Sequence, residues 1–102
     1  MDLVCRNQRS FFYVMKQIPL SKGFFAIVDD EDFEEINKHK WFAQRYSKSS
    51  YLCYAARRES ITFRLILMHR QIMKTPKGMD CDHINHNTLD NQKSNLRNCT
   101  HK

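Results

Sequence analysis

The sequence lacks the features that mark several classes of protein. No apolar run approaches the roughly 18 residues of a membrane span. Only two glycines and two prolines occur among 102 residues, and 12% of the residues are aromatic, which excludes fibrous and disordered chains. The first 13 residues lack the sustained apolar core and the cleavage site of a secretory signal. We therefore expect one small cytoplasmic domain without a membrane partner.

Closely spaced cysteine pairs are also missing. Cys5, Cys53, Cys81 and Cys99 are far apart, and no C-x-x-C pair indicates a zinc knuckle or a redox motif. In a chain without an export signal, these thiols are expected to be reduced. Small buried hydrophobic residues are the simplest interpretation, because free cysteine is among the most buried residue types.

Charge is unevenly distributed along the chain. Residues 1–35 carry a net charge of −3, whereas residues 36–102 carry +9, which gives +6 for the whole chain. Each lysine or arginine that neutralises a phosphate releases a condensed counterion, so a strongly basic body suits a polyanion. The charge favours a nucleic acid partner over a basic surface that serves only solubility.

Short apolar runs separated by polar turns predict an α+β domain of short antiparallel strands and short helices. Residues 16–20 and 24–28 form a predicted hairpin, in which Pro19 places its strand at an edge. An acidic start and a basic end predict a helix over 30–38 and explain its acids better than a metal site does. The remaining predicted elements are strands at 41–46, 51–57 and 61–65 and a helix at 66–73.

Aromatic and arginine side chains interleave along the second group of predicted strands. Such a surface can lie along a nucleic-acid backbone. A sheet with its aromatics inward and its arginines in solvent is an equally good interpretation. The residues concerned are Trp41, Tyr46, Tyr51, Tyr54, Arg45, Arg57, Arg58 and Arg64.

The last 24 residues, 79–102, are rich in asparagine and aspartate and poor in apolar side chains. Turns explain part of this composition, because both residue types bond their own backbone. Turns do not explain the pair formed by Asp82 and His83. A carboxylate can bind a divalent metal ion while a neutral imidazole takes a proton from water, and this pairing is the minimum for metal-assisted hydrolysis.

Three stretches of the C-terminal part together resemble the HNH endonuclease family, particularly its phage-borne and intron-borne homing members. They are residues 68–70 (MHR), 82–91 (DHINHNTLDN) and 95–97 (NLR). The N-terminal region that accompanies this type of HNH protein is similar to residues 18–23 (IPLSKG), 28–33 (VDDEDF) and 40–43 (KWFA). The resemblance implies a phage- or bacterium-encoded protein with an N-terminal extension at 1–15, a strand and helix region at 16–65 and the HNH motif region at 66–102.

The HNH resemblance implies metal-dependent hydrolysis of phosphodiester bonds in double-stranded DNA, with Mg²⁺ or Mn²⁺ as cofactor. Asp82 would bind the metal ion, and His83 would be the general base that activates water. Asn95, the central asparagine of the pattern, would belong to the catalytic set by holding the loop and the His83 ring in register. Asn87, Asp90 and Asn91 would organise the loop between the two strands of the motif.

Basic residues around the motif are the candidates for contacts with DNA phosphates. His69 is expected to pack beneath the active-site loop. His86 stands where such loops often have glycine, and we expect it to be exposed to solvent. The candidates for DNA contacts are Arg57, Arg58, Arg64, Arg70, Lys77, Lys93 and Arg97.

One part of the HNH pattern has no counterpart in the sequence. The motif is a ββα unit whose final helix supplies a further metal ligand, and residues 100–102 stand where that helix should begin, so an incomplete ββα hairpin is expected. A truncated copy, a site completed by a second copy or another partner, and a DNA-binding remnant without cleavage all fit this pattern. A non-catalytic DNA-binding module is therefore the alternative to an endonuclease.

A structural zinc site is a further alternative for the C-terminal hairpin. The ligand types present there suit zinc, and such a site would close the hairpin without the final helix. Their spacing matches no finger or ribbon pattern, so zinc is the less favoured interpretation. The ligands would come from Cys81, His83, His86, Cys99 and His101.

Overall fold

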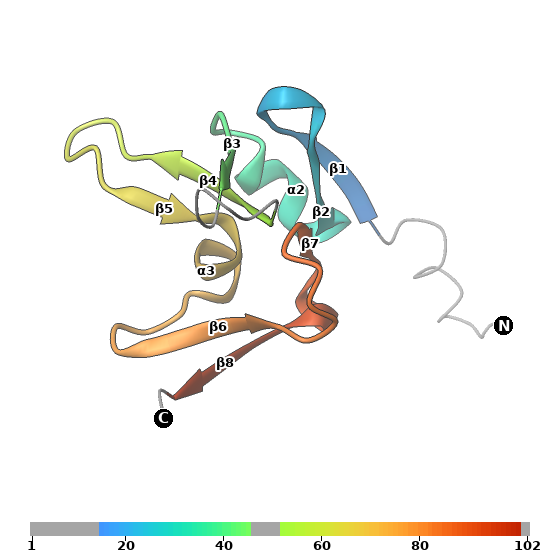
Figure 1. Ribbon diagram of the computed structural model, residues 1–102, viewed down its shortest axis with the longest axis vertical. Coiled ribbons are helices and arrows are strands. Elements are labelled where there is room, and N and C mark those ends of the chain that lie inside the picture. The colour runs from blue at the N-terminus through green and yellow to red at the C-terminus, as the bar shows by residue number, and fades with distance from the viewer. Residues whose placement is uncertain (1–14, 46–51, 101–102) are drawn as a thin grey trace, which may run out of the picture.

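The computed structural model describes residues 15–45 and 52–100, and it confirms a small α+β domain (Figure 1). Its strands are β1 (Met15–Pro19), β2 (Phe25–Asp29), β3 (Phe42–Arg45), β4 (Cys53–Arg58), β5 (Leu65–Leu67), β6 (Met79–His83), β7 (Asp90–Asn91) and β8 (Leu96–Thr100). Its helical elements are α2 (Asp30–Ile36), α3 (Met68–Met73) and the short 3-10 helices η2 (Ser21–Gly23) and η3 (Lys93–Asn95). No helix within the described residues is long and apolar enough to cross a membrane. The interpretations that concern residues 1–14, Tyr46, Tyr51 and His101 lie outside this part of the chain.

The first two strands form the predicted N-terminal hairpin. Ile18 of β1 lies opposite Ala26 of β2 in an antiparallel register. Pro19 is in an edge strand, as predicted, because the sheet order is β1-β2-β7. The turn between the strands has positive φ angles at Lys22 (60°) and Gly23 (81°), a conformation that glycine adopts without steric cost.

Helix α2 confirms the interpretation of the acidic run as a helix start. Three acids stand in its first turn, where negative charge stabilises the unpaired N–H groups of a helix N-terminus. The helix ends at Ile36, short of the predicted end at residue 38, because the chain turns there. The carbonyl of Ile36 accepts a hydrogen bond of 2.8 Å from Nε1 of the buried Trp41, which fixes the approach of the chain to β3.

The second sheet has the order β3-β4-β5, and its β3–β4 hairpin is the one that the sequence predicts. The predicted strand at 61–65 is wrong. Residues 59–64 form a closed loop instead, in which the N–H of Phe63 donates to the carbonyl of Glu59 at 2.9 Å. Strand β5 starts at Leu65, and its residue Leu67 pairs with Ala56. Helix α3 consequently begins at Met68 rather than at residue 66.

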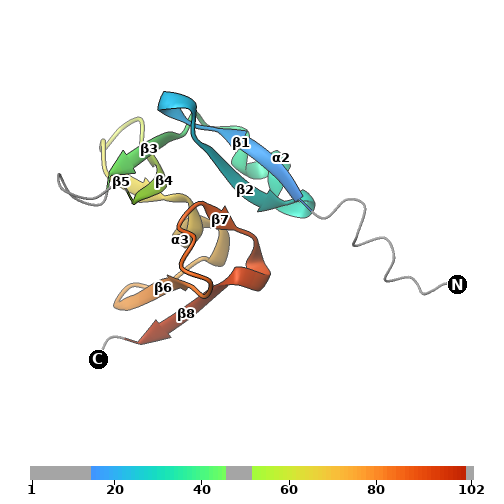
Figure 2. The ribbon, with the colours of Figure 1, turned by 45° about the vertical axis from the view of Figure 1, so that its right-hand side comes forward.

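The C-terminal part forms the predicted hairpin, in which β6 pairs with β8. The short strand β7 from the connection between them was not predicted, and it pairs in parallel with β2 through Ile27–Asp90 and Val28–Asn91. Figure 2 shows β7 beside β2 while the β6–β8 hairpin extends away from that sheet. The first sheet therefore combines strands of the N-terminal region, residues 16–65, with a strand of the C-terminal region, residues 66–102.

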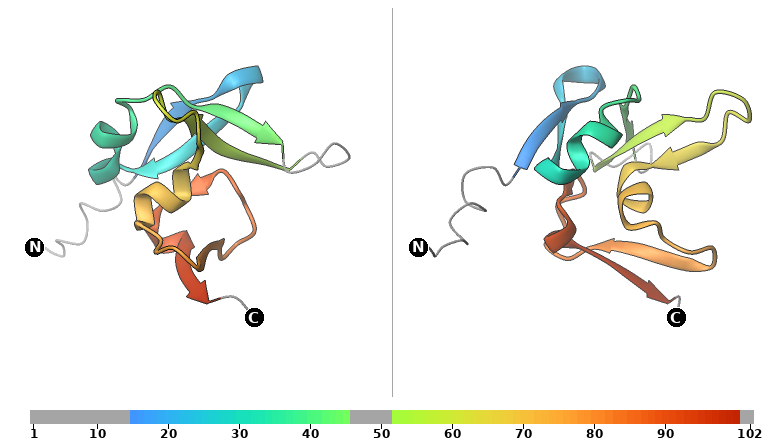
Figure 3. Two further views of the ribbon diagram at one scale, coloured as in Figure 1. Left: turned by 90° about the vertical axis from the view of Figure 1, so that its left-hand side faces the viewer. Right: turned by 180° about the vertical axis from the view of Figure 1, so that it is seen from behind.

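The buried core also joins the N-terminal region, residues 16–65, to the C-terminal region, residues 66–102. Residues of the β1–β2 hairpin and α2 pack with Met68 and Ile72 of α3 and with Leu96 of β8. Helix α3 lies between the β4–β5 hairpin and the β6–β8 hairpin in opposite views of the molecule (Figures 1 and 3). The core residues are Ile18, Ala26, Val28, Ile36, Trp41, Ala55, Met68, Ile72 and Leu96.

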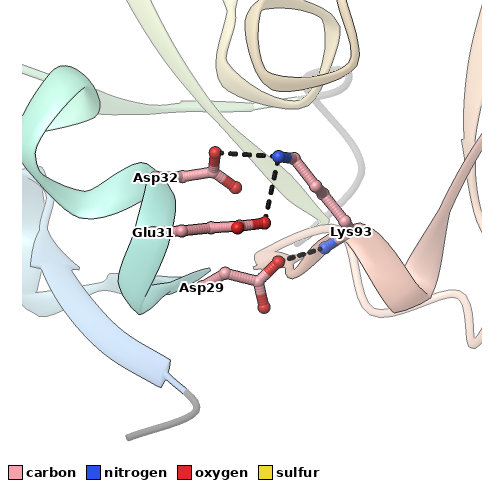
Figure 4. Close-up of polar contacts among 4 residues, drawn as sticks. All are labelled: Asp29, Glu31, Asp32 and Lys93. Carbon is pink, nitrogen blue, oxygen red and sulfur yellow. Dashed lines mark hydrogen bonds and ion pairs between the residues drawn. The ribbon is translucent and has the colours of Figure 1, made fainter. Parts of the chain in front are cut away.

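Lys93 adds a polar connection between the same two parts (Figure 4). Its Nζ lies 3.1 Å from a carboxylate oxygen of Glu31 and 3.2 Å from one of Asp32, and its N–H donates to Asp29 at 3.0 Å. The hydrogen bonds that the ammonium group donates to Glu31 and Asp32 raise the pKa of Lys93. The cluster of Asp29, Glu31 and Asp32 therefore already holds a cation, the ammonium group of Lys93.

Replacing Lys93 with methionine is expected to lower the free energy of unfolding by at most about 1 kcal/mol. The ammonium group is half exposed, so solvent screens its two ion pairs. Urea titrations measure the change, and Lys38→Met, which removes one exposed pair with Glu35, is the control with the smaller expected effect. A loss above about 2 kcal/mol would mean that the cluster depends on this cation much more than exposed pairs usually do.

Candidate active site

Asp82 and His83 occupy the last two positions of β6. Asp82 lies opposite Arg97 and His83 lies opposite Leu96 in the register with β8. Successive side chains of a strand point to opposite faces, so the two neighbours enter different environments. The His83 residue is only 5% exposed, whereas the side chain of Asp82 is half exposed.

The ring of His83 is held in one orientation. Its Nε2 lies 2.7 Å from Oδ1 of Asn91, and its ring centroid lies 4.5 Å from that of His69 and 6.1 Å from that of Tyr54. The amide oxygen of Asn91 accepts, so Nε2 carries the proton and Nδ1 carries the lone pair. Burial lowers the pKa of His83, an effect that Asn91 and Asp82 partly oppose. The site thus offers a neutral imidazole.

His69 lies beneath this ring, as the sequence predicts. It is 4% exposed, and its ring stacks on Tyr54 at 5.6 Å between centroids. Its Nδ1 is buried without a hydrogen-bond partner within the part of the chain that the structure describes. Burial first, and then the neighbouring charges of His83 and Arg70, lower the pKa of His69 to about 4, although Cys81 and Asp82 oppose the shift.

His69 is expected to make the fold less stable as the pH falls from about 6.5 to about 4. The native state keeps His69 neutral down to pH 4, whereas the unfolded chain takes up a proton near 6.5, so the unfolded state binds more protons between these values. The loss from this residue amounts to roughly 3 kcal/mol. Urea titrations across this range should show a smaller slope with pH for His69→Phe. Parallel curves for the two proteins would contradict the assignment.

Asn95 bridges the two ends of the loop that connects the strands. Its Oδ1 accepts from the N–H of Asn85 at 2.9 Å, and its Nδ2 donates to the carbonyl of Asp90 at 2.9 Å. The carbonyl of Asn95 also accepts from the N–H of Ile84 at 2.8 Å. Asn95 is 7% exposed, so these bonds form largely away from water. It fixes the loop, while the His83 ring itself is held by Asn91.

Short-range bonds shape the rest of the loop. The side chain of Asn85 accepts from the N–H of Asn87 at 2.8 Å and donates to Asp90 at 3.2 Å. The side chain of Asn87 accepts from the N–H of Leu89 at 3.1 Å. His86 is exposed, as predicted, and its φ of 67° explains why a glycine would suit this position. The loop-organising roles expected for Asn87 and Asp90 agree with these bonds.

Asp82 is the carboxylate available to a metal ion beside His83. Its Oδ2 accepts from Arg97 at 3.2 Å, and the pair is exposed. Mg²⁺ commonly takes one or two protein carboxylates and completes its shell with water and substrate phosphates, so a single half-exposed carboxylate at an open cleft fits such an ion. Among the described residues, Asp82 belongs to no group of three ligand-type side chains within reach of one ion.

The zinc alternative gains no support from the described residues. In that part of the chain, the only three ligand-type side chains within reach of one ion are Asp29, Glu31 and Asp32, and Lys93 already binds there. Cys81 donates instead to the carbonyl of His69, at 3.7 Å, and burial raises the pKa of its thiol.

A cleft of about 880 Å³ opens beside Asp82 and His83. Its walls come from β3, β4 and β5 on one side and from α3, β6 and β8 on the other. Arg70 reaches this cleft while its guanidinium donates to the carbonyl of Met79 at 2.9 Å. Residues of the lining include Tyr54, Leu67, His69, Arg70, Asp82 and His83.

The other predicted DNA contacts fall into distinct settings. Arg57 is half-buried, donates to Gln71 at 3.0 Å and lies over the ring of Trp41, so it has a packing role. Lys93 and Arg97 are engaged in ion pairs with acids of the protein. Arg58, Arg64 and Lys77 are exposed.

The sequence analysis missed three contributors to the site. For Tyr54 a nucleic-acid surface and an inward position in the sheet were equally good interpretations, and its ring packs on both histidines. Asn91 was expected only to organise the loop, but it bonds the His83 ring. Asn85 was given no role of its own, although it forms hydrogen bonds with both Asn95 and Asp90. Local sequence patterns carry no signal for these contacts, because each depends on tertiary packing.

Comparisons with models of protein families, with curated proteins and with solved structures gave no significant match for this chain.

Proposed function

We propose that the protein is a metal-dependent endonuclease of the HNH type that hydrolyses phosphodiester bonds of double-stranded DNA. The observation that carries the proposal is the pair of consecutive residues at the end of β6, which offer an accessible carboxylate and a neutral imidazole whose Nε2 is held by Asn91. Both residues line one cleft. The resemblance of residues 82–97 to the HNH motif and the bridge made by Asn95 support the same conclusion.

In the proposed reaction, Nδ1 of His83 takes a proton from a water molecule as the water oxygen attacks phosphorus. The bond between phosphorus and the 3′ oxygen breaks, and the leaving oxygen takes a proton from solvent. Arg70, which lines the cleft, holds a phosphate oxygen by a charge-assisted hydrogen bond. A Mg²⁺ or Mn²⁺ ion held by Asp82 supplies positive charge against the phosphate and the leaving oxygen when it is bound.

A DNA-binding module without cleavage is the second candidate. The observation in its favour is the ion pair of Asp82 with Arg97, because that pair engages the carboxylate on which cleavage depends. A second copy of the chain or another protein that adds a metal ligand beside Asp82 is a further arrangement compatible with activity. The basic body of the protein suits duplex DNA in each case.

Nicking of supercoiled plasmid tests the proposal. The purified chain is expected to convert the plasmid to its open circular form with Mg²⁺ or Mn²⁺, and EDTA is expected to stop the reaction. Fluorescence anisotropy with a labelled duplex measures binding under the same conditions. Binding of the duplex without nicking in either metal ion would favour the DNA-binding module over the endonuclease. Absence of both binding and nicking would contradict the proposal that DNA is the partner.

A further inference from the structure

The loop between β4 and β5 exposes two large apolar side chains. Ile61 is 83% exposed and Phe63 is 70% exposed, and the neighbouring Leu65 at the start of β5 is 40% exposed. Contiguous exposed apolar side chains usually mark a binding surface. We call residues 61, 63 and 65 the apolar tip.

The apolar tip is held in place rather than loosely extended. The N–H of Glu59 donates to the carbonyl of Arg64 at 2.9 Å, and the N–H of Phe63 donates to the carbonyl of Glu59 at 2.9 Å. The hydroxyl of Thr62 also donates to the Glu59 carboxylate. Phe63 has a φ of 60°, which a bulky side chain adopts only at an energetic cost. The loop therefore holds an aromatic ring in solvent with a fixed backbone.

Positive charge flanks the apolar tip. Arg58 and Arg64 are exposed at the two ends of the loop, and Nη1 of Arg58 donates to the carbonyl of Phe63 at 3.2 Å. Neither arginine forms an ion pair within residues 15–45 and 52–100. The carboxylate of Glu59, the acid of the loop, accepts a hydrogen bond from the hydroxyl of Thr62. An apolar centre between two guanidinium groups that lack ion pairs in the described residues is complementary to a base step between two phosphate backbones.

The apolar tip is continuous with the candidate active site. Leu65 belongs both to the tip and to the lining of the cleft that contains Asp82 and His83. The β4–β5 and β6–β8 hairpins lie on either side of α3 (Figure 1). A polyanion that enters the cleft therefore meets the tip on the same side of the molecule.

We propose that the apolar tip inserts Phe63, supported by Ile61, between neighbouring base pairs of duplex DNA, while Arg58 and Arg64 bind the flanking phosphates. The inference rests on the proposed DNA partner and adds a specific mode of contact. A side-chain wedge partly unstacks one base step and bends the duplex. Flexible pyrimidine–purine steps yield most easily, so the tip favours sites that contain them.

Duplexes that carry 2-aminopurine at TA steps test the wedge, because the fluorescence of this base rises when it is unstacked. Binding of the whole protein in EDTA is expected to raise the fluorescence. Phe63→Ala is expected to abolish the rise and to weaken binding about tenfold. Phe25→Ala removes another exposed phenylalanine, 49% exposed in β2, and is expected to leave both signals unchanged.

The outcomes separate the wedge from the proposed function. Wild-type protein that nicks and binds DNA without any rise in fluorescence overturns the wedge and leaves the endonuclease intact. Loss of self-association in Phe63→Ala by sedimentation, with DNA binding unchanged, makes the tip a contact between copies of the chain and also overturns the wedge. Absence of binding and nicking in the wild type removes the DNA partner and the wedge together. Melting curves confirm that both variants are folded.

Discussion

Replacing His83 with alanine is expected to lower the rate of plasmid nicking by about 10²- to 10⁴-fold, the usual contribution of a general base. The variant keeps Asp82, so the carboxylate and the charge of the cleft remain. It loses the nitrogen that takes the proton from water, and the neighbouring His69 does not replace it, because His69 is buried with a pKa of about 4. The rate constant for conversion of supercoiled to open circular plasmid measures the loss.

His39→Ala is the matched control for this variant. It removes an imidazole that does not line the cleft and is expected to leave the nicking rate within about twofold, as for a residue without proton transfer. Duplex affinity by anisotropy should be the same for both variants and the wild type. Retention of more than a tenth of the wild-type rate by a folded His83→Ala protein would mean that His83 is not the general base.

The elements predicted correctly are those set by local chemistry. The β1–β2 hairpin follows from two apolar runs around a turn that contains Gly23, and α2 follows from acids placed where the helix dipole favours them. The strand predicted at 61–65 was wrong because Ile61 and Phe63 have strand-like propensity but lie in solvent. A prediction that equates apolar character with burial fails where apolar side chains lie in solvent instead of in the core.

Contacts between segments far apart in the chain limit how much of the candidate site can be predicted from the sequence. The positions of Asp82, His83 and Asn95 could be inferred from their local order along the chain. The parallel pairing of Val28 with Asn91 could not, because two residues of β7 carry no strand signal of their own. This pairing puts Asn91, which is fully buried, against the His83 ring. Strand β2, far along the chain from residues 82–97, thus fixes the orientation of the proposed general base.

Asn95→Ala is expected to lower the free energy of unfolding by about 2 to 4 kcal/mol, because two backbone groups lose their partners in a largely buried place. The N–H of Asn85 and the carbonyl of Asp90 are the groups left unpaired. The nicking rate is expected to fall about 10- to 100-fold at a temperature where the variant is folded, as for residues that position a catalytic group. Urea titrations and plasmid nicking measure the two effects.

Asn98→Ala is the control that separates an effect of Asn95 on the position of the loop from an effect on the stability of the fold. Asn98 lies in β8, three residues after Asn95, and its side chain also forms two hydrogen bonds, one from Thr75 at 2.7 Å and one to the carbonyl of Met73 at 3.3 Å. These bonds reach the end of α3 and the residues that follow it, and not the loop. Asn98→Ala should therefore lose stability without losing activity when it is folded. Equal losses of activity in the two variants would show that Asn95 acts only through general stability. A fall in rate confined to Asn95→Ala would mean that the buried bridge acts on the proposed base through the loop, since the loop that Asn95 closes runs from His83 at the end of β6 to Asn91, which bonds the His83 ring.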